Sequence, residues 1–290
     1  MNLNYFLFRI LTFFPISFLR FIGYSKIGSE LIMYLKKRSE SNKKPYDVGN
    51  GIKMYVDYTD RRQLNLILRR DREKITKEVF LKNINKGDTI IDCGANIGEF
   101  SLLAARKVGP TGKVISIEPA RKIATKLKEN FLLNNFDNFK ILELAVGDKP
   151  HKATLYEHGI SEASSLDSTL LGKPTTGTSE IQVETLDNII SSLDIDKVDM
   201  IKIDVDAFEY ETLLGCRESF SKNRIKNILC EVHYSLLKKR GINDNIIYDM
   251  LKKNGFSVEF IVKDEAAKVV YILASYVKGK ISENLRQHHQ

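Results

Sequence analysis

The chain has little cysteine and no long apolar run. The first argues against a zinc site, and the second argues against a segment that spans a membrane. Its 290 residues include three cysteines, Cys93, Cys216 and Cys230, whose spacing fits no zinc site. We expect them to be buried, reduced thiols of an intracellular protein. The longest uncharged run near the N-terminus, residues 10–19, is shorter than the roughly 20 apolar residues that span a bilayer. No small-x-small cleavage site follows it, so a secretory signal is not expected.

The positive charge lacks the pattern of a nucleic-acid-binding surface. The net charge is +8, but no basic stripe is interleaved with the aromatic residues that stack on bases. The lysines are spread over ordinary helix faces, apart from one cluster formed by Lys36, Lys37, Arg38, Lys43 and Lys44. We therefore expect no nucleic-acid partner. Solvated helix faces and a basic linker account for most of the charge, and anionic lipid is a better alternative than RNA as a partner of the cluster.

The segment before this cluster is aromatic and basic. Residues 3–24 hold six of the fifteen phenylalanines, and Arg9 and Arg20 flank the uncharged run. This composition is typical of a helix that lies in a membrane interface. We weigh it equally against a helix that packs on the following domain or on a second copy in a homodimer. The expected location is cytoplasmic, and in the first case residues 1–38 would be a peripheral contact to the cytoplasmic face of the membrane.

Length and composition favour one domain of about 200 residues with shorter additions. The chain divides into an N-terminal helix and linker (1–45), a lead-in (46–83), the main domain (84–277) and a polar tail (278–290). In the lead-in, Gly49-Asn50-Gly51 predicts a hairpin, and a helix is expected over residues 60–83.

Residues 87–119 carry the most informative pattern. A short apolar run over residues 89–91 predicts a buried strand, and Asp92-Cys-Gly94-Ala-Asn96-Ile-Gly98 predicts a sharp turn. A helix follows, and a second apolar strand, residues 113–117, leads to Glu118. The glycines let the backbone approach a ligand closely, and an acid at this strand end can bind a ribose diol. The pattern indicates a cofactor that contains a nucleoside.

The composition of the turn distinguishes between two such cofactors. A dinucleotide site has the motif G-x-G-x-x-G, which lets the backbone pack on a pyrophosphate, and this turn lacks it. Asp92, pointing into the crevice, would repel a pyrophosphate but suit a cation that carries an amino group and a sulfonium. We therefore expect S-adenosylmethionine (SAM). An NAD-dependent oxidoreductase on the same architecture is an alternative.

Further acids follow the later strands. Residues 139–146 predict a third strand that leads to Asp148, and residues 198–203 predict a fourth that leads to Asp204-Val-Asp206-Ala207-Phe-Glu209. The fifth strand carries Glu231 and His233. With these motifs, and with Asn130 and Asn134 at a helix end, the chain resembles the FkbM family of SAM-dependent methyltransferases over roughly residues 72 to 262. The family has Glu-Gly where Asp206-Ala207 stands here.

The resemblance implies an α/β doubly wound, Rossmann-like class I methyltransferase sheet. Strands one to five are expected to be parallel, with an antiparallel closing hairpin over residues 256–262 and 269–276. The cofactor is expected across the carboxyl ends of the strands, with Glu118 on the ribose hydroxyls and Asp148 beside the adenine. The residues expected to bind SAM are Asp92, Gly94, Ala95, Asn96, Gly98, Glu99, Glu118, Pro119, Val146, Asp148 and Asp204.

The implied reaction is methyl transfer to a hydroxyl of a sugar, a lipid-linked glycan or a secondary metabolite. Asp204, His233 and Glu209 are the expected catalytic residues, with His233 as general base because a histidine pKa ordinarily lies near neutral pH. No metal site is expected. A divalent cation shared by Asp204 and Glu231 is a weaker alternative, because no clustered ligand spacing is visible. A non-catalytic SAM-binding scaffold is the remaining alternative, supported only by the Asp206-Ala207 departure.

A long polar loop follows the third strand. Residues 153–156 and 181–185 predict further strands on either side of a loop over residues 158–179. Loops of this length in compact domains are usually functional, and its serines (Ser161, Ser164 and Ser165) resemble serines of the family. We expect this loop and residues 46–75 to shape the acceptor pocket.

Overall fold

The computed structural model describes residues 45–56, 63, 73–158, 163–170 and 175–277. The chain divides into two compact units, residues 1–72 and 73–290, and each is described by itself. The predicted membrane-interface segment (1–38), the polar tail (278–290), and residues 60–62 and 64–72 of the helix expected over 60–83 lie outside the described residues. In the described part of the chain, no helix combines the length and apolar composition needed to cross a bilayer.

The first unit contains a β-hairpin. Strand β1 (Pro45–Gly49) pairs antiparallel with β2 (Ile52–Tyr55). The backbone has positive φ at Gly49, Asn50 and Gly51, a conformation that glycine and asparagine tolerate best. The hairpin predicted from this turn is confirmed.

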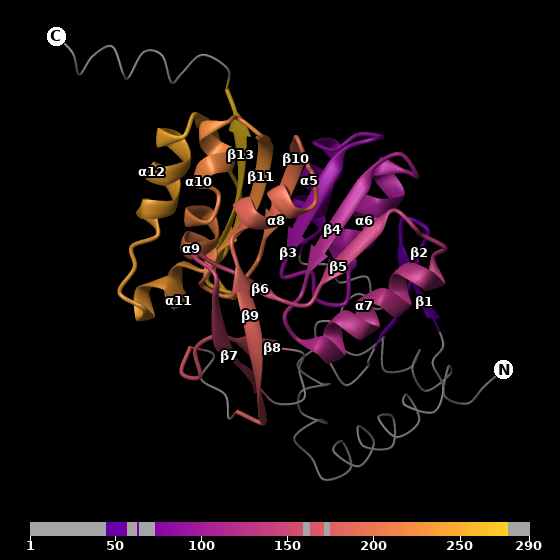
Figure 1. Ribbon diagram of the computed structural model, residues 1–290, viewed down its shortest axis with the longest axis horizontal. Coiled ribbons are helices and arrows are strands. Elements are labelled where there is room, and N and C mark those ends of the chain that lie inside the picture. Colours follow the sequence, from indigo (N-terminus) through magenta and orange to yellow (C-terminus); the bar gives the residue numbers. More distant parts are fainter. Residues whose placement is uncertain (1–44, 57–62, 64–72, 159–162, 171–174, 278–290) are drawn as a thin grey trace. The chain divides into compact units, whose positions relative to one another are not determined.

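The second unit is built on a seven-stranded sheet. Its strands are β3 (Thr89–Cys93), β4 (Lys113–Ile117), β5 (Phe139–Leu142), β10 (Val198–Ile203), β11 (Ile225–Val232), β12 (Phe256–Asp264) and β13 (Val269–Tyr276). They lie in the order β12-β13-β11-β10-β3-β4-β5 (Figure 1). All neighbours pair in parallel except β13, which is antiparallel to β11 and β12. This order and the antiparallel strand are those of a class I methyltransferase sheet, so the predicted fold and its closing hairpin are confirmed.

Helices cover both faces of this sheet. They are α5 (Lys74–Lys82), α6 (Glu99–Val108), α7 (Arg121–Leu133), α8 (Leu186–Ser192), α9 (Glu209–Leu214), α10 (Arg217–Ser221), α11 (Tyr234–Lys239) and α12 (Asn245–Lys253). Successive side chains of a strand point to opposite faces. Ile201 of β10 lies in a core with Leu213 of α9 and Leu251 of α12. The next residue, Lys202, lies on the other face, 5.2 Å from the ring centre of Phe100 on α6.

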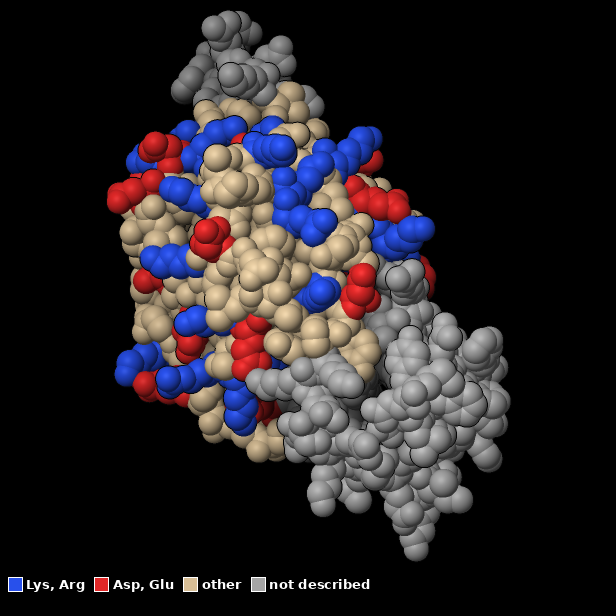
Figure 2. Space-filling model, turned by 90° about the vertical axis from the view of Figure 1, so that its right-hand side faces the viewer, with Lys and Arg blue, Asp and Glu red and all other residues tan. Residues whose placement is uncertain are grey.

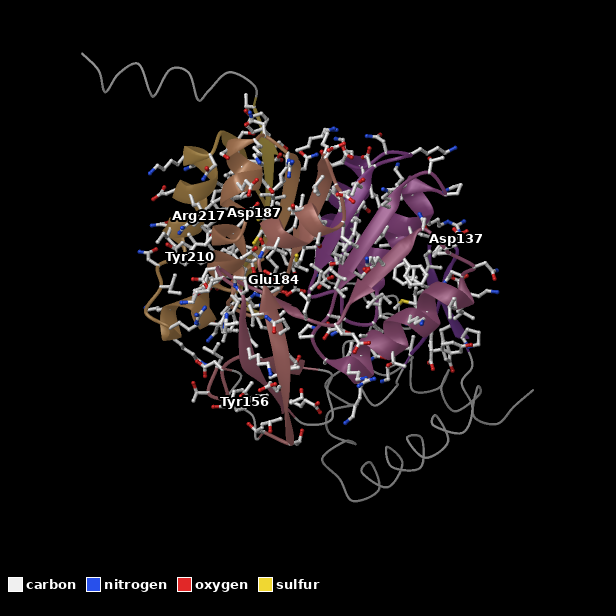
Figure 3. All side chains as sticks on the ribbon, viewed as in Figure 1. Asp137, Tyr156, Glu184, Asp187, Tyr210 and Arg217 are labelled. Carbon is white, nitrogen blue, oxygen red and sulfur yellow. The ribbon has the colours of Figure 1, made fainter. Side chains whose placement is uncertain are left out.

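Packing between helices is fixed in one place by a side-chain cap. The carboxylate of Asp187 on α8 accepts hydrogen bonds from the N–H groups of Glu218 and Ser219, each at 2.8 Å. These amides belong to the first turn of α10, which has no earlier carbonyls to bond. Figure 3 shows Asp187 beside Arg217, where α10 begins. The first turn of α8 therefore sets the position of α10.

The third predicted strand is divided between two sheets. β5 ends at Leu142, and the next residues of the prediction form β6 (Ala145–Val146) in a separate four-stranded sheet. The prediction of one strand over residues 139–146 is therefore wrong. The chain leaves its neighbour β4 and pairs instead with Val183 and Glu184, partners that are remote in sequence.

The four-stranded sheet has the order β6-β9-β7-β8, with β7 (His151–His158), β8 (Ala163–Ser165) and β9 (Gly177–Glu184). It extends from the edge at which the parallel strands end (Figure 1). The two strands predicted here are confirmed but are longer than expected, and β8 occupies part of the expected loop. Leu170, which follows β8, is buried in the core, and its carbonyl accepts a hydrogen bond from Lys239 of α11 at 3.0 Å. The described part of the loop is therefore packed on the domain.

The burial of the cysteines follows the sequence analysis. Cys93, Cys216 and Cys230 are free and buried, as predicted, and burial raises the pKa of each thiol. On the face drawn in Figure 2, basic side chains lie among acidic and uncharged ones. Surface ion pairs such as Lys197–Asp199, at 2.7 Å, join opposite charges. This mixture is ordinary for a solvated surface.

Candidate active site

The turn after β3 brings the ends of two strands into contact. Gly94 has a φ of 75°, and a Cβ on it would lie 1.8 Å from the backbone oxygen of Asp204, just after β10. Only glycine fits at this position. Asn96 and Gly98 also have positive φ, at 50° and 102°, and α6 begins at Glu99. The predicted turn therefore lies at the carboxyl edge of the sheet, directly beside Asp204.

Glu118 is held by the backbone of two loops. Its Oε2 accepts a hydrogen bond from the N–H of Asn96 at 2.9 Å, and its Oε1 accepts one from the N–H of Ala120 at 3.0 Å. The residue is 5% exposed. A carboxylate oxygen can accept more than one hydrogen bond. This is an arrangement suited to a ribose diol, and that contact stays a prediction.

Asp92 lies beneath the turn and not in the crevice. It is 1% exposed, and its Oδ2 accepts a hydrogen bond from the Ser101 hydroxyl at 2.6 Å. Its Oδ1 lies 3.7 Å from Nζ of Lys202. Burial raises the pKa of Asp92, and the charge of Lys202 opposes that rise. The expectation that this carboxylate points into the crevice is wrong: the side chain contacts α6 and β10, where it supports the turn.

The remaining predicted cofactor residues differ in their surroundings. They comprise buried Ala95 and Val146, half-buried Pro119 and exposed Asp148. Glu99 forms an ion pair with Lys77, one of the lysines of α5, so it joins α5 to α6. Ligand contact by these residues stays a prediction.

The buried Lys202 links the carboxylate of Asp92 on β3 to that of Asp204, which follows β10. Nζ of Lys202 donates to Oδ2 of Asp204 at 3.1 Å and lies 3.7 Å from Asp92. The lysine is 6% exposed. Burial alone would lower the pKa of Lys202, but the carboxylates of Asp204 and Asp92 raise it above its ordinary value. The ammonium therefore stays charged and holds the ends of β3 and β10 together.

His233, at the end of β11, is surrounded by carboxylates. Its Nδ1 lies 2.8 Å from Oε1 of Glu209. Its Nε2 lies 3.5 Å from Asp206, 3.6 Å from Glu231 and 3.8 Å from Asp204. The residue is 7% exposed. The structure thus brings together the three predicted catalytic residues, Asp204, Glu209 and His233.

The electrostatics change the role expected of His233. Burial alone would lower its pKa, but the charge and hydrogen bond of Glu209, with the charges of Glu231 and Asp204, raise it to about 10. A general base near neutral pH must be unprotonated. The expected base role depended on an ordinary pKa, and the structure corrects that premise. The neighbouring carboxylates therefore favour the protonated form of the ring.

Glu209 is a positioning residue and not a group that can touch a substrate. It is fully buried at the start of α9, and its Oε1 also accepts a hydrogen bond from the N–H of Ala207 at 2.9 Å. The expectation of a catalytic contact by Glu209 is corrected on this ground. Its carboxylate fixes both the turn before α9 and the orientation of the His233 ring.

The turn that carries Asp206 departs from ordinary backbone geometry. Asp206 and Ala207 have positive φ, at 46° and 78°. The FkbM-type pattern has glycine at the second of these positions, and glycine adopts this conformation most readily. Here the alanine is fully buried, and its carbonyl accepts a hydrogen bond from Arg240. The turn therefore forms in this chain although alanine, which is less suited to a positive φ than glycine, stands at position 207.

Two buried polar residues of the site received no role in the sequence analysis. Asn130 of α7 is fully buried and donates to the carbonyl of Ile97 at 2.9 Å, which holds the Gly-rich turn. Lys202 joins Asp92 to Asp204. The signal for Lys202 was present, because a single lysine stands within the apolar strand Val198–Ile203. A buried charge of this kind needs a partner.

The matching family decides the class of protein. The Methyltransferase FkbM domain matches residues 92–258, which extend from the end of β3 to the beginning of β12. The chain belongs to the FkbM methyltransferase family. The family predicted from the turn and strand-end motifs is therefore confirmed, and the site described above falls within the matched residues.

Similar proteins extend across this FkbM domain at low identity. The chain is 28% identical over 192 residues to 31-O-demethyl-FK506 methyltransferase FkbM of Streptomyces tacrolimicus, covering 56% of this chain and 73% of that protein. It is 23% identical over 230 residues to AMB antimetabolite synthetase AmbE of Pseudomonas aeruginosa, covering 65% of this chain but only 11% of AmbE. Among solved structures, SMU.1697c of Streptococcus mutans in complex with SAH has a TM-score of 0.46 at 9% identity, covering 71% of this chain and 98% of that one.

Proposed function

We propose that this FkbM-family protein is a SAM-dependent O-methyltransferase. Its acceptor would be a hydroxyl of a sugar, a lipid-linked glycan or a secondary metabolite. The cofactor assignment depends on a single observation, the position of Glu118. Its carboxylate accepts hydrogen bonds from two backbone amides beside the Gly-rich turn. An acid at the end of the second strand in such a sheet binds the ribose hydroxyls of a nucleoside.

The site would hold the cofactor along the carboxyl edge of the sheet. Gly94, Ala95, Asn96 and Gly98 would lie against it from the turn, and Val146 and Asp148 beside its adenine. The backbone of Asp204 lies beside Gly94, which supports a contact between the Asp204 carboxylate and the opposite, amino-acid end of the cofactor. Carboxylates at that end favour a cationic cofactor over a pyrophosphate, which supports SAM over NAD.

Oxygen as the methylated atom is favoured by one relative. The Streptomyces tacrolimicus FkbM protein is named as a methyltransferase of 31-O-demethyl-FK506. A methylated hydroxyl loses its proton during transfer, and a group in the site must accept it. Asp204 is the candidate, because its side chain is 25% exposed whereas Glu209 is fully buried and engaged.

Catalysis would depend mainly on orientation. Bound SAM supplies an electrophilic methyl group on a positively charged sulfur. The chain needs to hold the acceptor oxygen in line with that methyl group, and placement of this kind accounts for much of the rate of such transfers. Asp204 and His233, which lie 3.8 Å apart, would flank the acceptor from neighbouring strands.

Calorimetric titration of the full chain with SAM and with NAD tests the cofactor. We expect binding of SAM and none of NAD, and the reverse result would favour the oxidoreductase alternative. Transfer of labelled methyl groups to extracts of glycolipids and secondary metabolites then tests catalysis. Binding of SAM without any transfer would favour a non-catalytic scaffold.

Peripheral membrane contact through residues 1–38 is a separate part of the proposal. The support is the aromatic and basic composition of that segment, which matches helices that lie in a membrane interface. Flotation of the full chain with liposomes that contain anionic lipid tests it. Co-flotation that high salt only partly reverses is expected, because salt screens the basic residues but leaves aromatic burial unchanged. A chain that stays at the bottom of the gradient favours a helix that packs on the domain or in a homodimer.

A further inference from the structure

One group of side chains in the site has the composition of a metal centre. A carboxylate oxygen of Asp204, another of Asp206 and a ring nitrogen of His233 all lie within 4.8 Å of one another. They come from positions far apart in sequence, the segment after β10 and the end of β11. A carboxylate oxygen of Glu231 lies 3.6 Å from the same Nε2 of His233. Oxygen and imidazole ligands of this kind suit divalent cations.

The His233 ring is aimed into this group by a buried partner. The residue is 7% exposed, and Nδ1 donates its hydrogen to Glu209, because a carboxylate can only accept. Nε2 faces three carboxylates at 3.5 to 3.8 Å. A histidine that donates through one nitrogen to a carboxylate and presents the other to a metal is the usual arrangement of histidine ligands.

The distances fit ligands around an ion better than hydrogen bonds. The separations of 3.5 to 3.8 Å between Nε2 and the carboxylate oxygens are longer than normal N–H···O bonds, which measure about 2.7 to 3.2 Å. With metal–ligand bonds of about 2.0 to 2.2 Å, ligand atoms lie about 3 Å apart at right angles and about 4 Å apart when opposed. The separations of 3.5 to 3.8 Å from Nε2 to the carboxylate oxygens fall between these two values.

The local charge also favours a cation. Carboxylates outnumber cations among the described residues of the network, which comprises Asp204, Asp206, Glu209 and Glu231 with Lys202 and His233. Within that described part, the second oxygen of Glu209 is buried and makes no hydrogen bond. Buried carboxylates are costly unless a positive charge or donors compensate them.

We propose that Asp204, Asp206 and Nε2 of His233 bind a divalent cation, with Glu231 within reach as a further ligand. Glu209 is then the positioning residue that sets the tautomer and direction of the imidazole. The mixture of carboxylates with one imidazole favours a first-row transition ion such as Mn²⁺, because Mg²⁺ takes oxygen ligands and water. If the proposed methyl transfer is correct, the ion would hold the acceptor hydroxyl beside Asp204 and lower its pKa.

Titration of the full, metal-stripped chain with Mn²⁺ tests the proposal directly. Electron paramagnetic resonance follows free Mn²⁺, and circular dichroism confirms that each variant is folded. We expect one saturable site per chain, with affinity at least about 10-fold lower in Asp206→Asn and in Glu209→Gln, the usual effect of losing a ligand or its orienting partner. The matched control is Asp249→Asn, an exposed acid on α12, which should bind as the wild type does.

Two results would overturn the metal site. One is a folded wild-type chain that binds no Mn²⁺ at millimolar concentration, and the other is equal affinity in wild type, Asp206→Asn and Glu209→Gln. SAM binding and methyl transfer are measured separately on the same preparations. Mn²⁺ binding without methyl transfer would therefore refute the proposed function alone, and methyl transfer by a chain that binds no Mn²⁺ would refute the metal site alone.

Discussion

The carboxylates of the candidate site have different partners in its two regions, the ends of β3 and β4 and the ends of β10 and β11. At the ends of β3 and β4, Glu118 accepts two backbone N–H groups and Asp92 accepts a hydroxyl. At the ends of β10 and β11, the carboxylates converge on a single imidazole at distances mostly too long for hydrogen bonds. In the first region both carboxylates accept hydrogen bonds from the protein, and the one buried oxygen without a hydrogen bond among the described residues, Oδ1 of Asp92, faces the ammonium of Lys202 at 3.7 Å. The second has an excess of negative charge that a bound cation would offset.

The difference arises from what each turn can donate. The Gly-rich turn directs the N–H of Asn96, a residue with positive φ, to Glu118, and the loop after β4 adds the N–H of Ala120. The turn after β10 uses its Ala207 amide on Glu209. A site built on backbone donors is pre-formed for a neutral diol, whereas one built on acids selects for positive charge.

The largest effect is expected from the residue that joins the two regions. Lys202→Met removes the cation between Asp92 and Asp204 and leaves a fully buried carboxylate uncompensated. We expect the free energy of unfolding to fall by about 3 to 5 kcal/mol, the usual cost of breaking a buried pair from one side. Chemical denaturation measures it.

The matched control for this variant is Lys197→Met. Lys197 also pairs with an aspartate, Asp199, but its side chain is 59% exposed. Exposed pairs contribute less than about 1 kcal/mol. If both variants lose the same stability, Lys202 is not the link described above.

The next effect separates the first region from the second. Glu118→Ala should weaken SAM binding by about 2 to 4 kcal/mol, roughly 30-fold to 1000-fold, because two charge-assisted hydrogen bonds to the ribose are lost. Calorimetry measures the affinity, and Glu143→Ala, an exposed acid beyond β5, serves as control. An affinity within twofold of wild type would show that the strand-end acid does not bind the cofactor.

The complementary variant in the second region is His233→Ala. We expect turnover to fall by about 100-fold, the lower end of what removal of a group at the reacting centre costs, while SAM affinity changes by less than about twofold. Steady-state kinetics and calorimetry give the two quantities. Equal loss of cofactor affinity in His233→Ala and Glu118→Ala would remove the distinction between the regions.

The smallest effect concerns the turn of the second region. Ala207→Gly removes the conformational cost of alanine at a positive φ, about 1 to 2 kcal/mol. It also removes a buried methyl group, whose burial contributes about 0.8 kcal/mol. We expect a net stabilisation of up to about 1 kcal/mol, measured by thermal or chemical unfolding. A clear loss of stability would mean that burial of the alanine outweighs its backbone conformation.

Local sequence patterns were sufficient to predict most secondary-structure elements and the position of the residues at the expected cofactor end of the site. The Gly-Asn-Gly hairpin, the strand-turn-helix from Thr89 to Val108 and the position of Glu118 depend on residues close together in the chain. Backbone preferences and the alternation of apolar side chains are readable at that range. The sequence motifs also indicated the FkbM family, which the match over residues 92–258 confirms.

Tertiary structure alone decided where the charges point. Asp92 was expected in the crevice, but Ser101 and Lys202 hold it beneath the turn. His233 was expected to have an ordinary pKa, but buried Glu209 and the acids of two strand ends raise it. Residues 139–146 were predicted to form one strand. Ala145 and Val146 instead pair with residues of β9 about forty positions later in the chain, and the local pattern does not reveal such a distant partner. Burial and the sum of neighbouring charges depend on segments brought together only by folding, so a sequence pattern names the acids of this site but not their surroundings.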